Sequence, residues 1–432
     1  MIVLPFLYFS FVLSYILFKK REFDISAYVI SLYTITSFFA ILVDINNLRS
    51  FDTIGYQISL LPSVLYCSLL TLTIWPFYQL KTTRIAHIKL NRPKLFNFII
   101  YFYFGCFLLI LASSFNSIIQ ILTGNLVELR SALYKGESIT NINIGGVFKP
   151  LFIIANIFGS FSIIMILFYF YSITYLHRSK LFNAIILLSS ISIILIGIIG
   201  IDRSKVFYWM VSYGFCLVLF WPRLNKKQHK GILIVSGLIL SAVMLYFLVL
   251  TFSRFDIQDT GGGGSMISYG GQAFINFSFF FDKVNYREFT LQRIFPLVYK
   301  LFVDNGIQNT GQLNEVIGLQ TGKNLGVFST FIGDIMVACG RLVAILYCII
   351  FYFLSRWLLG KRIILNFYQL VFLFCLITVP MLGIFVDYYA GFEVTIPLIC
   401  FLIYAWNLRF RHLKYITQKK LKLKNNEPPI LD

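Results

Sequence analysis

The sequence predicts an all-α, polytopic integral membrane protein with about eleven transmembrane helices. Of the 432 residues, 58% are hydrophobic and only 13% are charged, and the mean hydropathy is +0.79. A soluble globule of this length could not bury so much apolar surface. The apolar residues also fall in runs close to the ~20 residues that an α-helix needs to cross a bilayer. We therefore expect one membrane domain that comprises residues 1–432.

Eleven apolar runs are the expected membrane spans. They comprise residues 2–18, 25–43, 58–80, 96–121, 148–176, 182–199, 206–221, 232–252, 330–354, 364–386 and 394–408. The first run is followed by Lys19, Lys20 and Arg21 and carries no small-residue cleavage pattern. We interpret it as a retained span and not as a cleaved signal peptide.

Positive charge is sorted between the two sets of loops that these spans define. The loops on one side contain 24 of the 37 Lys and Arg residues and only four of the 18 acidic residues. Such an excess marks the cytoplasmic side, so the N-terminus is expected outside and the C-terminus in the cytoplasm. The net charge of +19 is then explained by topology and by anionic lipid headgroups of the bilayer. No nucleic-acid partner is expected, because no recognition motif accompanies the charge.

Two outer insertions interrupt the pattern, at residues 122–147 and 253–329. The second begins with Gly261–Gly264 and Ser265, a composition typical of a flexible hinge. Apolar residues then recur at helical spacing near 290–303, which favours an amphipathic helix on the membrane surface or over a cavity. A packed loop helix without lipid contact is the alternative, and Pro296 would kink either helix.

Three arginines on the expected outer face are candidate functional residues: Arg130, Arg203 and Arg254. An arginine is always charged, and its planar fork can bind two phosphate oxygens at once. Several converging arginines would suit a diphosphate. The alternative for each is a helix-end side chain that reaches toward lipid headgroups or pairs with a nearby Asp202 or Asp256. Neighbouring residues that we expect to assist in substrate binding are Glu128, Tyr134, Lys135, Ser204 and Lys205.

Carboxylates are the second class of candidate. Asp256 and Asp334 lie on the expected outer face, and Asp334 precedes a strongly apolar run. A carboxylate beside an apolar cavity can act as a general base. Arg341 follows Asp334 by seven residues, and we expect the two on the same helical face. No metal site and no cofactor are expected, since neither a DxD motif nor a dinucleotide or Walker fingerprint is present. The seven cysteines show no C-x-x-C spacing, and all four histidines fall in predicted cytoplasmic loops.

These residues give the chain a resemblance to a known family. A short outer turn carries Gly200, Asp202, Arg203 and Ser204, and the loop with Arg130 is rich in glycine. A long late loop starts at Arg254 and precedes a span that includes Gly333, Asp334 and Gly340. In these features the chain resembles the O-antigen polymerases, also called oligosaccharide repeat-unit polymerases, over most of its length. It departs from them in spacing, because Gly261–Gly264 follow Arg254 more closely than Gly146 follows Arg130.

The resemblance implies a GT-C-like polymerase architecture in the bacterial cytoplasmic (inner) membrane. It also implies a metal-independent glycosyltransferase whose donor and acceptor are undecaprenyl-diphosphate-linked oligosaccharides on the periplasmic face. The product would be O-antigen, capsule or another exopolysaccharide. The catalytic residues would come from Arg130, Arg203, Arg254, Asp256 and Asp334. A chain-length regulator and a flippase are the implied protein partners.

Other function classes remain open from the sequence. A lipid-linked oligosaccharide flippase or other transporter is the main non-enzymatic alternative, although transporters usually place charges near mid-span. An O-antigen ligase would have a similar architecture, but it is expected to use an outer histidine. A receptor or a structural membrane protein is the remaining alternative.

Overall fold

The computed structural model describes most of the chain. The described residues are 1–80, 88, 90, 92–123, 148–200, 202–237, 241, 262–284, 292, 299, 302–303, 310–321, 328–360, 366–390 and 392–424. The regular elements within them are helices. They are α1 (Val3–Lys20), α2 (Ile25–Ile45), η1 (Phe51–Thr53), α3 (Leu60–Tyr78), α4 (Pro93–Thr123), α6 (Phe148–Gly159), α7 (Ile164–Tyr171), η3 (Ser172–Leu176), α8 (Lys180–Ser190), α9 (Ser192–Ile199), α10 (Arg203–Phe220), η4 (Trp221–Arg223), α12 (Gly262–Lys283), α14 (Thr310–Thr321), α15 (Thr330–Cys339), α16 (Arg341–Leu359), α17 (Phe367–Leu382), η5 (Tyr388–Ala390) and α18 (Phe392–Lys424).

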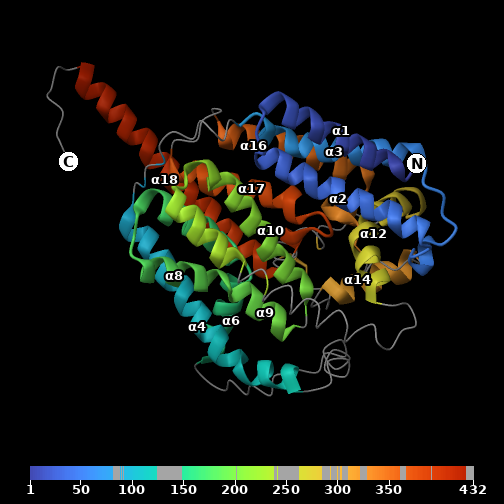
Figure 1. Cartoon of the computed structure of the whole chain (residues 1–432), viewed down its shortest axis with the longest axis horizontal. Coiled ribbons are helices and arrows are strands. Elements are labelled where there is room, and N and C mark those ends of the chain that lie inside the picture. Colours follow the sequence, from blue (N-terminus) through green and yellow to red (C-terminus); the bar gives the residue numbers. More distant parts are fainter. Residues whose placement is uncertain are drawn as a thin grey trace.

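The prediction of an all-α membrane protein with many spans is confirmed. Within the described residues, eight helices are long and apolar enough to cross a membrane, and a bent pair raises the count to nine. The helices form one bundle, with α1, α2 and α3 on one side and α4, α6 and α8 on the other (Figure 1). The helices α10 and α17 pack between the two groups, since α10 contacts α2, α7 and α9 and α17 contacts α3 and α18.

Two of the predicted spans are interrupted. The run 148–176 divides into α6 and α7, and the two halves are bent by 68° at the break. The run 330–354 divides into α15 and α16 at Gly340, whose φ of +89° lies in a region that only glycine enters readily. The prediction of one continuous helix was wrong here, because hydropathy does not detect a single residue with helix-breaking geometry. Asp334 and Arg341 therefore lie on different helices, and the expectation of a shared helical face was also wrong.

The helix α12 lies within the predicted second insertion and packs closely against α2. A Cβ atom added to Gly271 would lie 2.6 Å from the backbone nitrogen of Ala40 in α2, and one added to Gly270 would meet the Phe39 ring. The two helices can approach this closely only because these positions lack side chains. The glycine run that suggested a hinge begins α12 at Gly262, so that interpretation was wrong. Most of the predicted helix near 290–303 lies outside the described residues.

The two ends of the bundle can be named by the ends of α10. Arg203 begins α10, and Arg223, which follows its last turn, interacts electrostatically with Glu22 in the connection between α1 and α2. Since an α-helix rises about 1.5 Å per residue, the 18 residues of α10 alone extend over about 27 Å between these two ends. We call the first of these ends the Arg203 end. We call the other the Asp24 end, because Asp24, the residue that caps α2, lies there.

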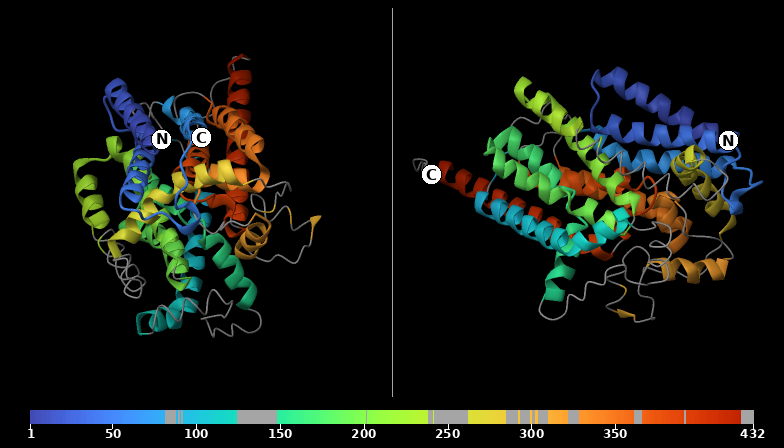
Figure 2. Two further views of the ribbon diagram at one scale, coloured as in Figure 1. Left: turned by 90° about the vertical axis from the view of Figure 1, so that its right-hand side faces the viewer. Right: turned by 60° about the horizontal axis from the view of Figure 1, so that its bottom comes forward.

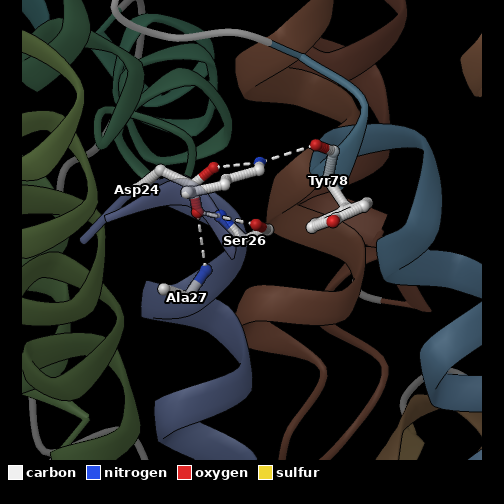
Figure 3. Close-up of polar contacts among 5 residues, drawn as sticks. Asp24, Ser26, Ala27 and Tyr78 are labelled. Carbon is white, nitrogen blue, oxygen red and sulfur yellow. Dashed lines mark hydrogen bonds and ion pairs between the residues drawn. The ribbon is translucent and has the colours of Figure 1, made fainter. Parts of the chain in front are cut away.

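A buried carboxylate organises the Asp24 end (Figure 3). Asp24 is 3% exposed and caps α2 by accepting hydrogen bonds from the backbone nitrogens of Ser26 (3.1 Å) and Ala27 (2.9 Å). Lys20 forms an ion pair with the same carboxylate and donates to the backbone oxygen of Tyr78 over 2.6 Å. The cluster therefore ties together the end of α1, the start of α2 and the end of α3.

Replacing Asp24 with alanine is expected to lower the free energy of unfolding by about 2 kcal/mol, because α2 loses its cap and Lys20 loses its partner. The measurement is the thermal midpoint of the full-length protein in detergent. Asp44→Ala is the matched control, since Asp44 lies near the other end of α2 in a partly exposed ion pair with Arg49, which should contribute about 1 kcal/mol. Equal midpoints for the two variants would contradict this role of Asp24.

Candidate functional site

The turn between α9 and α10 fixes the position of Arg203. The carboxylate of Asp202 caps α10 by accepting hydrogen bonds from the Ser204 backbone nitrogen (2.9 Å) and from the Ser204 hydroxyl (2.7 Å). The Asp202 backbone nitrogen donates to the Gly197 oxygen over 2.7 Å. Lys205 lies against Gly197, where an added Cβ atom would be 3.0 Å from the Lys205 Cβ. The Asp202 cap and the Asp202–Gly197 hydrogen bond thus hold Arg203 in place as the first residue of α10.

Arg203 lies over an aromatic ring of a distant segment. Its guanidinium carbon is 4.8 Å from the centroid of the Tyr269 ring, which belongs to α12. A guanidinium on an aromatic face is attracted by the ring quadrupole and loses part of its freedom. The predicted site residue is therefore held in place by two separate parts of the chain, the capped turn before α10 and the face of α12.

Three further rings continue from Tyr269 across the Arg203 end of the bundle. The Tyr269 ring lies 5.6 Å from Phe328, Phe328 lies 5.1 Å from Phe385, and Phe385 lies 5.1 Å from Phe207, measured between ring centroids. We call these four residues the aromatic group. All four are half-buried, so each presents part of its ring outside the core. They come from α12, the segment just before α15, the connection after α17, and α10.

Asp334 lies beside this group and is 5% exposed. Its Oδ1 accepts a hydrogen bond from the Ser329 hydroxyl over 3.0 Å, and its Oδ2 accepts one from the Asp387 backbone nitrogen over 2.6 Å. The backbone nitrogens of Ser329 and Thr330 both donate to the Phe385 oxygen (2.9 and 2.8 Å). These bonds fasten the start of α15 to the connection between α17 and α18. Asp334 thereby helps to position two rings of the aromatic group.

Tyr208 connects the Arg203 turn with the Asp334 cluster. Its phenol interacts electrostatically with Asp202, Asp334 and Asp387, and its ring lies 4.9 Å from the ring of Tyr388. Burial raises the pKa of the Tyr388 phenol well above its ordinary value. The Tyr388 phenol donates a hydrogen bond to the Ser160 backbone oxygen over 2.8 Å.

The structure thus brings together four of the predicted site residues and leaves the others unplaced. Arg203, Ser204 and Lys205 share the first turn of α10, and Asp334 is linked to this turn through Tyr208. The remaining predicted residues lie outside the described part of the chain: Glu128, Arg130, Tyr134, Lys135, Arg254 and Asp256. Arg341 begins α16 and contacts α12 at another place, with its guanidinium carbon 4.5 Å from the Phe281 centroid.

Sequence reasoning missed most of the aromatic group. Tyr269 lies in the predicted second outer insertion, but Phe207, Phe328 and Phe385 are three of 47 phenylalanines, and nothing in their local sequence separates them from core residues. Asp387 carried a weak signal, because it is an acid in a short connection between two apolar runs. Its backbone nitrogen donates a hydrogen bond to Asp334, a contact that the side-chain type does not reveal.

The arrangement offers a fixed cation next to partly exposed rings. The guanidinium suits phosphate oxygens, and aromatic faces suit the apolar faces of sugars. Within the described residues, no three His, Cys, Asp or Glu side chains come together in a way that could hold a metal ion. The chain matches no model of a known protein family, no curated protein and no solved structure.

Proposed function

We propose that the protein is a membrane glycosyltransferase that polymerises undecaprenyl-diphosphate-linked oligosaccharide repeat units. In this proposal the chain has about eleven spans and a GT-C-like architecture, with its N-terminus in the periplasm and its C-terminus in the cytoplasm. The Arg203 end then faces the periplasm of a bacterial cytoplasmic membrane. The product is O-antigen, capsule or another exopolysaccharide.

The fixed position of Arg203 is the observation that carries the proposal. A lipid diphosphate is an anion at headgroup depth, and the end of a spanning helix is where its charge can be met. Arg203 starts α10, is half-buried, and is held over Tyr269. Fixed positive charge of this kind stabilises the negative charge that develops on a departing diphosphate without reorganising during the reaction. In the proposal, Arg130 and Arg254 converge on the same diphosphate.

The aromatic group supports a saccharide substrate. Its four half-buried rings extend from the ring that contacts Arg203. A sugar attached to a diphosphate bound at Arg203 would lie within reach of these rings. The same rings would hold the donor and acceptor sugars in a defined orientation, which contributes to rate by positioning.

The reaction balances with the groups that the proposal names. A hydroxyl of the new repeat unit attacks the anomeric carbon of the growing chain, and the bond from that carbon to the diphosphate oxygen breaks. The electron pair leaves with undecaprenyl diphosphate, and a carboxylate accepts the hydroxyl proton. Both oxygens of Asp334 already accept hydrogen bonds, which favours a positioning role for Asp334 and leaves Asp256 as the candidate proton acceptor.

A transporter is the second candidate, and one observation favours it. The bend between α6 and α7 lies against the junction of α8 and α9, because the Ser162 hydroxyl donates to the Ser190 oxygen (3.1 Å) and accepts from the Ile193 nitrogen (3.0 Å). Transporters often bind their substrates at interrupted helices. An O-antigen ligase is less favoured, since His229 stacks on Trp221, about 27 Å along α10 from Arg203.

Deleting the gene and sizing the surface glycan tests the proposal against its rivals. Loss of the polymer with a single repeat unit retained on the surface supports a polymerase. Loss of all exported repeat units indicates a flippase, and polymer that accumulates on its lipid carrier indicates a ligase. Either of the last two results would overturn the proposal.

A further inference from the structure

Two tryptophans and an arginine form a cluster where α16 and α18 complete their apolar segments. Trp357 lies in the last turn of α16, and Trp406 and Arg409 lie at the end of the apolar segment Glu393–Phe410 of α18. The Arg409 guanidinium carbon is 4.9 Å from the Trp357 ring and 5.1 Å from the Trp406 ring, and the two rings are 5.5 Å apart. Beyond this point α18 continues away from the bundle (Figure 2).

Both indoles lie on the outer surface of the bundle. Trp357 is 55% exposed and Trp406 is 46% exposed. Tryptophans at the ends of membrane spans commonly lie at the level of the lipid headgroups. Exposed apolar side chains, Phe353 and Leu354, precede Trp357 on α16, and Phe410 follows Arg409 on α18. The cluster therefore combines a headgroup-level position with adjacent surface for acyl chains.

Arg409 has no anionic partner within the described part of the chain. Its contacts there are the two indole faces and an electrostatic interaction with Tyr368. The Nη1 atom of Arg409 is buried and makes no hydrogen bond to any residue in the described part of the chain. A guanidinium near an apolar medium is costly unless an anion or a hydrogen-bond acceptor meets it. The two indole rings lie only 5.5 Å apart and so contact the guanidinium from neighbouring directions, which leaves its N–H groups other than the buried Nη1 for an outer acceptor.

We propose that Arg409, Trp357 and Trp406 bind the phosphate of an anionic phospholipid headgroup. The guanidinium edge donates to the phosphate oxygens in the bidentate manner that arginine allows and lysine does not. The acyl chains pack along the exposed apolar side chains of α16 and α18, which commits the site to a lipid and not to free phosphate. The inference does not depend on the proposed glycosyltransferase activity, because the cluster lies on other helices than Arg203.

The test compares how lipids stabilise the full-length protein against heat in detergent. Adding dioleoylphosphatidylglycerol should raise the thermal midpoint of the wild type more than dioleoylphosphatidylcholine does, because a ligand that binds only the folded state stabilises it. Arg409→Gln and Arg409→Lys should weaken the apparent affinity for phosphatidylglycerol about tenfold, the effect expected for loss of hydrogen bonds from a charged group. Inorganic phosphate, tested as a third addition, should not reproduce the stabilisation.

Arg356→Gln is the matched control. Arg356 lies in the same turn of α16 as Trp357, but its guanidinium donates to the Tyr352 hydroxyl over 2.9 Å and is exposed. Its loss should leave the phosphatidylglycerol effect unchanged. If Arg409→Gln lowers the midpoint equally with and without either lipid, the cluster only braces α16 against α18 and the proposal is overturned. Stabilisation by inorganic phosphate as strong as by phosphatidylglycerol would overturn the assignment to a lipid.

Native mass spectrometry keeps the proposal testable if Arg409→Gln does not fold. Trp357→Leu retains the arginine and an apolar surface but removes one stacking face. This variant should carry less co-purified phosphatidylglycerol than the wild type, while Arg356→Gln carries the same amount. Equal amounts of bound phosphatidylglycerol on all three proteins would contradict the proposed site.

Discussion

Replacing Arg203 with alanine is expected to abolish polymer while leaving single lipid-linked repeat units in the cell. In our account Arg203 supplies fixed positive charge to the departing diphosphate, and loss of one such preorganised group costs about 100-fold or more in rate. The measurement is the length distribution of the surface glycan in cells that express the variant at wild-type protein levels. Arg203→Lys should also be impaired, because a point charge does not reproduce the planar fork or its contact with Tyr269.

Arg341→Ala is the control for this prediction. Arg341 makes the same kind of contact with α12, over Phe281, twelve residues from Tyr269. That separation corresponds to about 18 Å along the helix, so the control removes an arginine–aromatic contact without reaching the proposed site. Full-length polymer from cells carrying Arg203→Ala, or equal losses from both variants, would contradict a specific role for Arg203.

Replacing Gly271 with alanine is expected to lower the free energy of unfolding by about 3 kcal/mol, at the upper end of the cost of overpacking. The new methyl group would overlap the backbone of α2 at Phe39 and would lie 2.6 Å from the Ala40 nitrogen. A backbone cannot rotate away as a side chain can, so α12 must move. The measurement is the thermal midpoint of the full-length protein in detergent.

Gly105→Ala provides the comparison for Gly271→Ala. Gly105 lies in α4, and an added Cβ atom there would meet nothing within 4 Å, so the substitution should be neutral or stabilising by about 1 kcal/mol. Because α12 also carries Tyr269, displacing α12 should reduce glycan length as well as stability. A Gly271→Ala protein as stable as Gly105→Ala would rule out close packing of α12 against α2 at this position.

Hydropathy predicted most of the helical bundle, and its errors have identifiable causes. The long apolar run of α2 became a single helix because it contains neither glycine nor proline. Gly340 breaks a run through its backbone conformation, which an average over many residues cannot register. Hydropathy did not predict the helix α12, because this helix packs against α2 through Gly270 and Gly271. These glycines stand where a more hydrophobic helix would have the bulky apolar residues that hydropathy detects.

The candidate site was predictable only where charge marks it. Arg203 and Asp334 stand out because charged residues at the ends of apolar runs are few. The half-buried rings of Phe207, Phe328 and Phe385 come from three separate segments, and only tertiary contacts bring them together. The positioning role of Asp334 was equally hidden, since its partner is the backbone nitrogen of a residue more than fifty positions away.

Reconstituting the purified full-length protein in liposomes with undecaprenyl-diphosphate-linked repeat units tests the central claim most directly. The measurement is the number of repeat units per lipid carrier after incubation, resolved by gel electrophoresis or mass spectrometry. Our account predicts a ladder of products with two or more repeat units, together with released undecaprenyl diphosphate, and no ladder with Arg203→Ala. Repeat units that cross the bilayer but remain single would contradict the account and indicate transport.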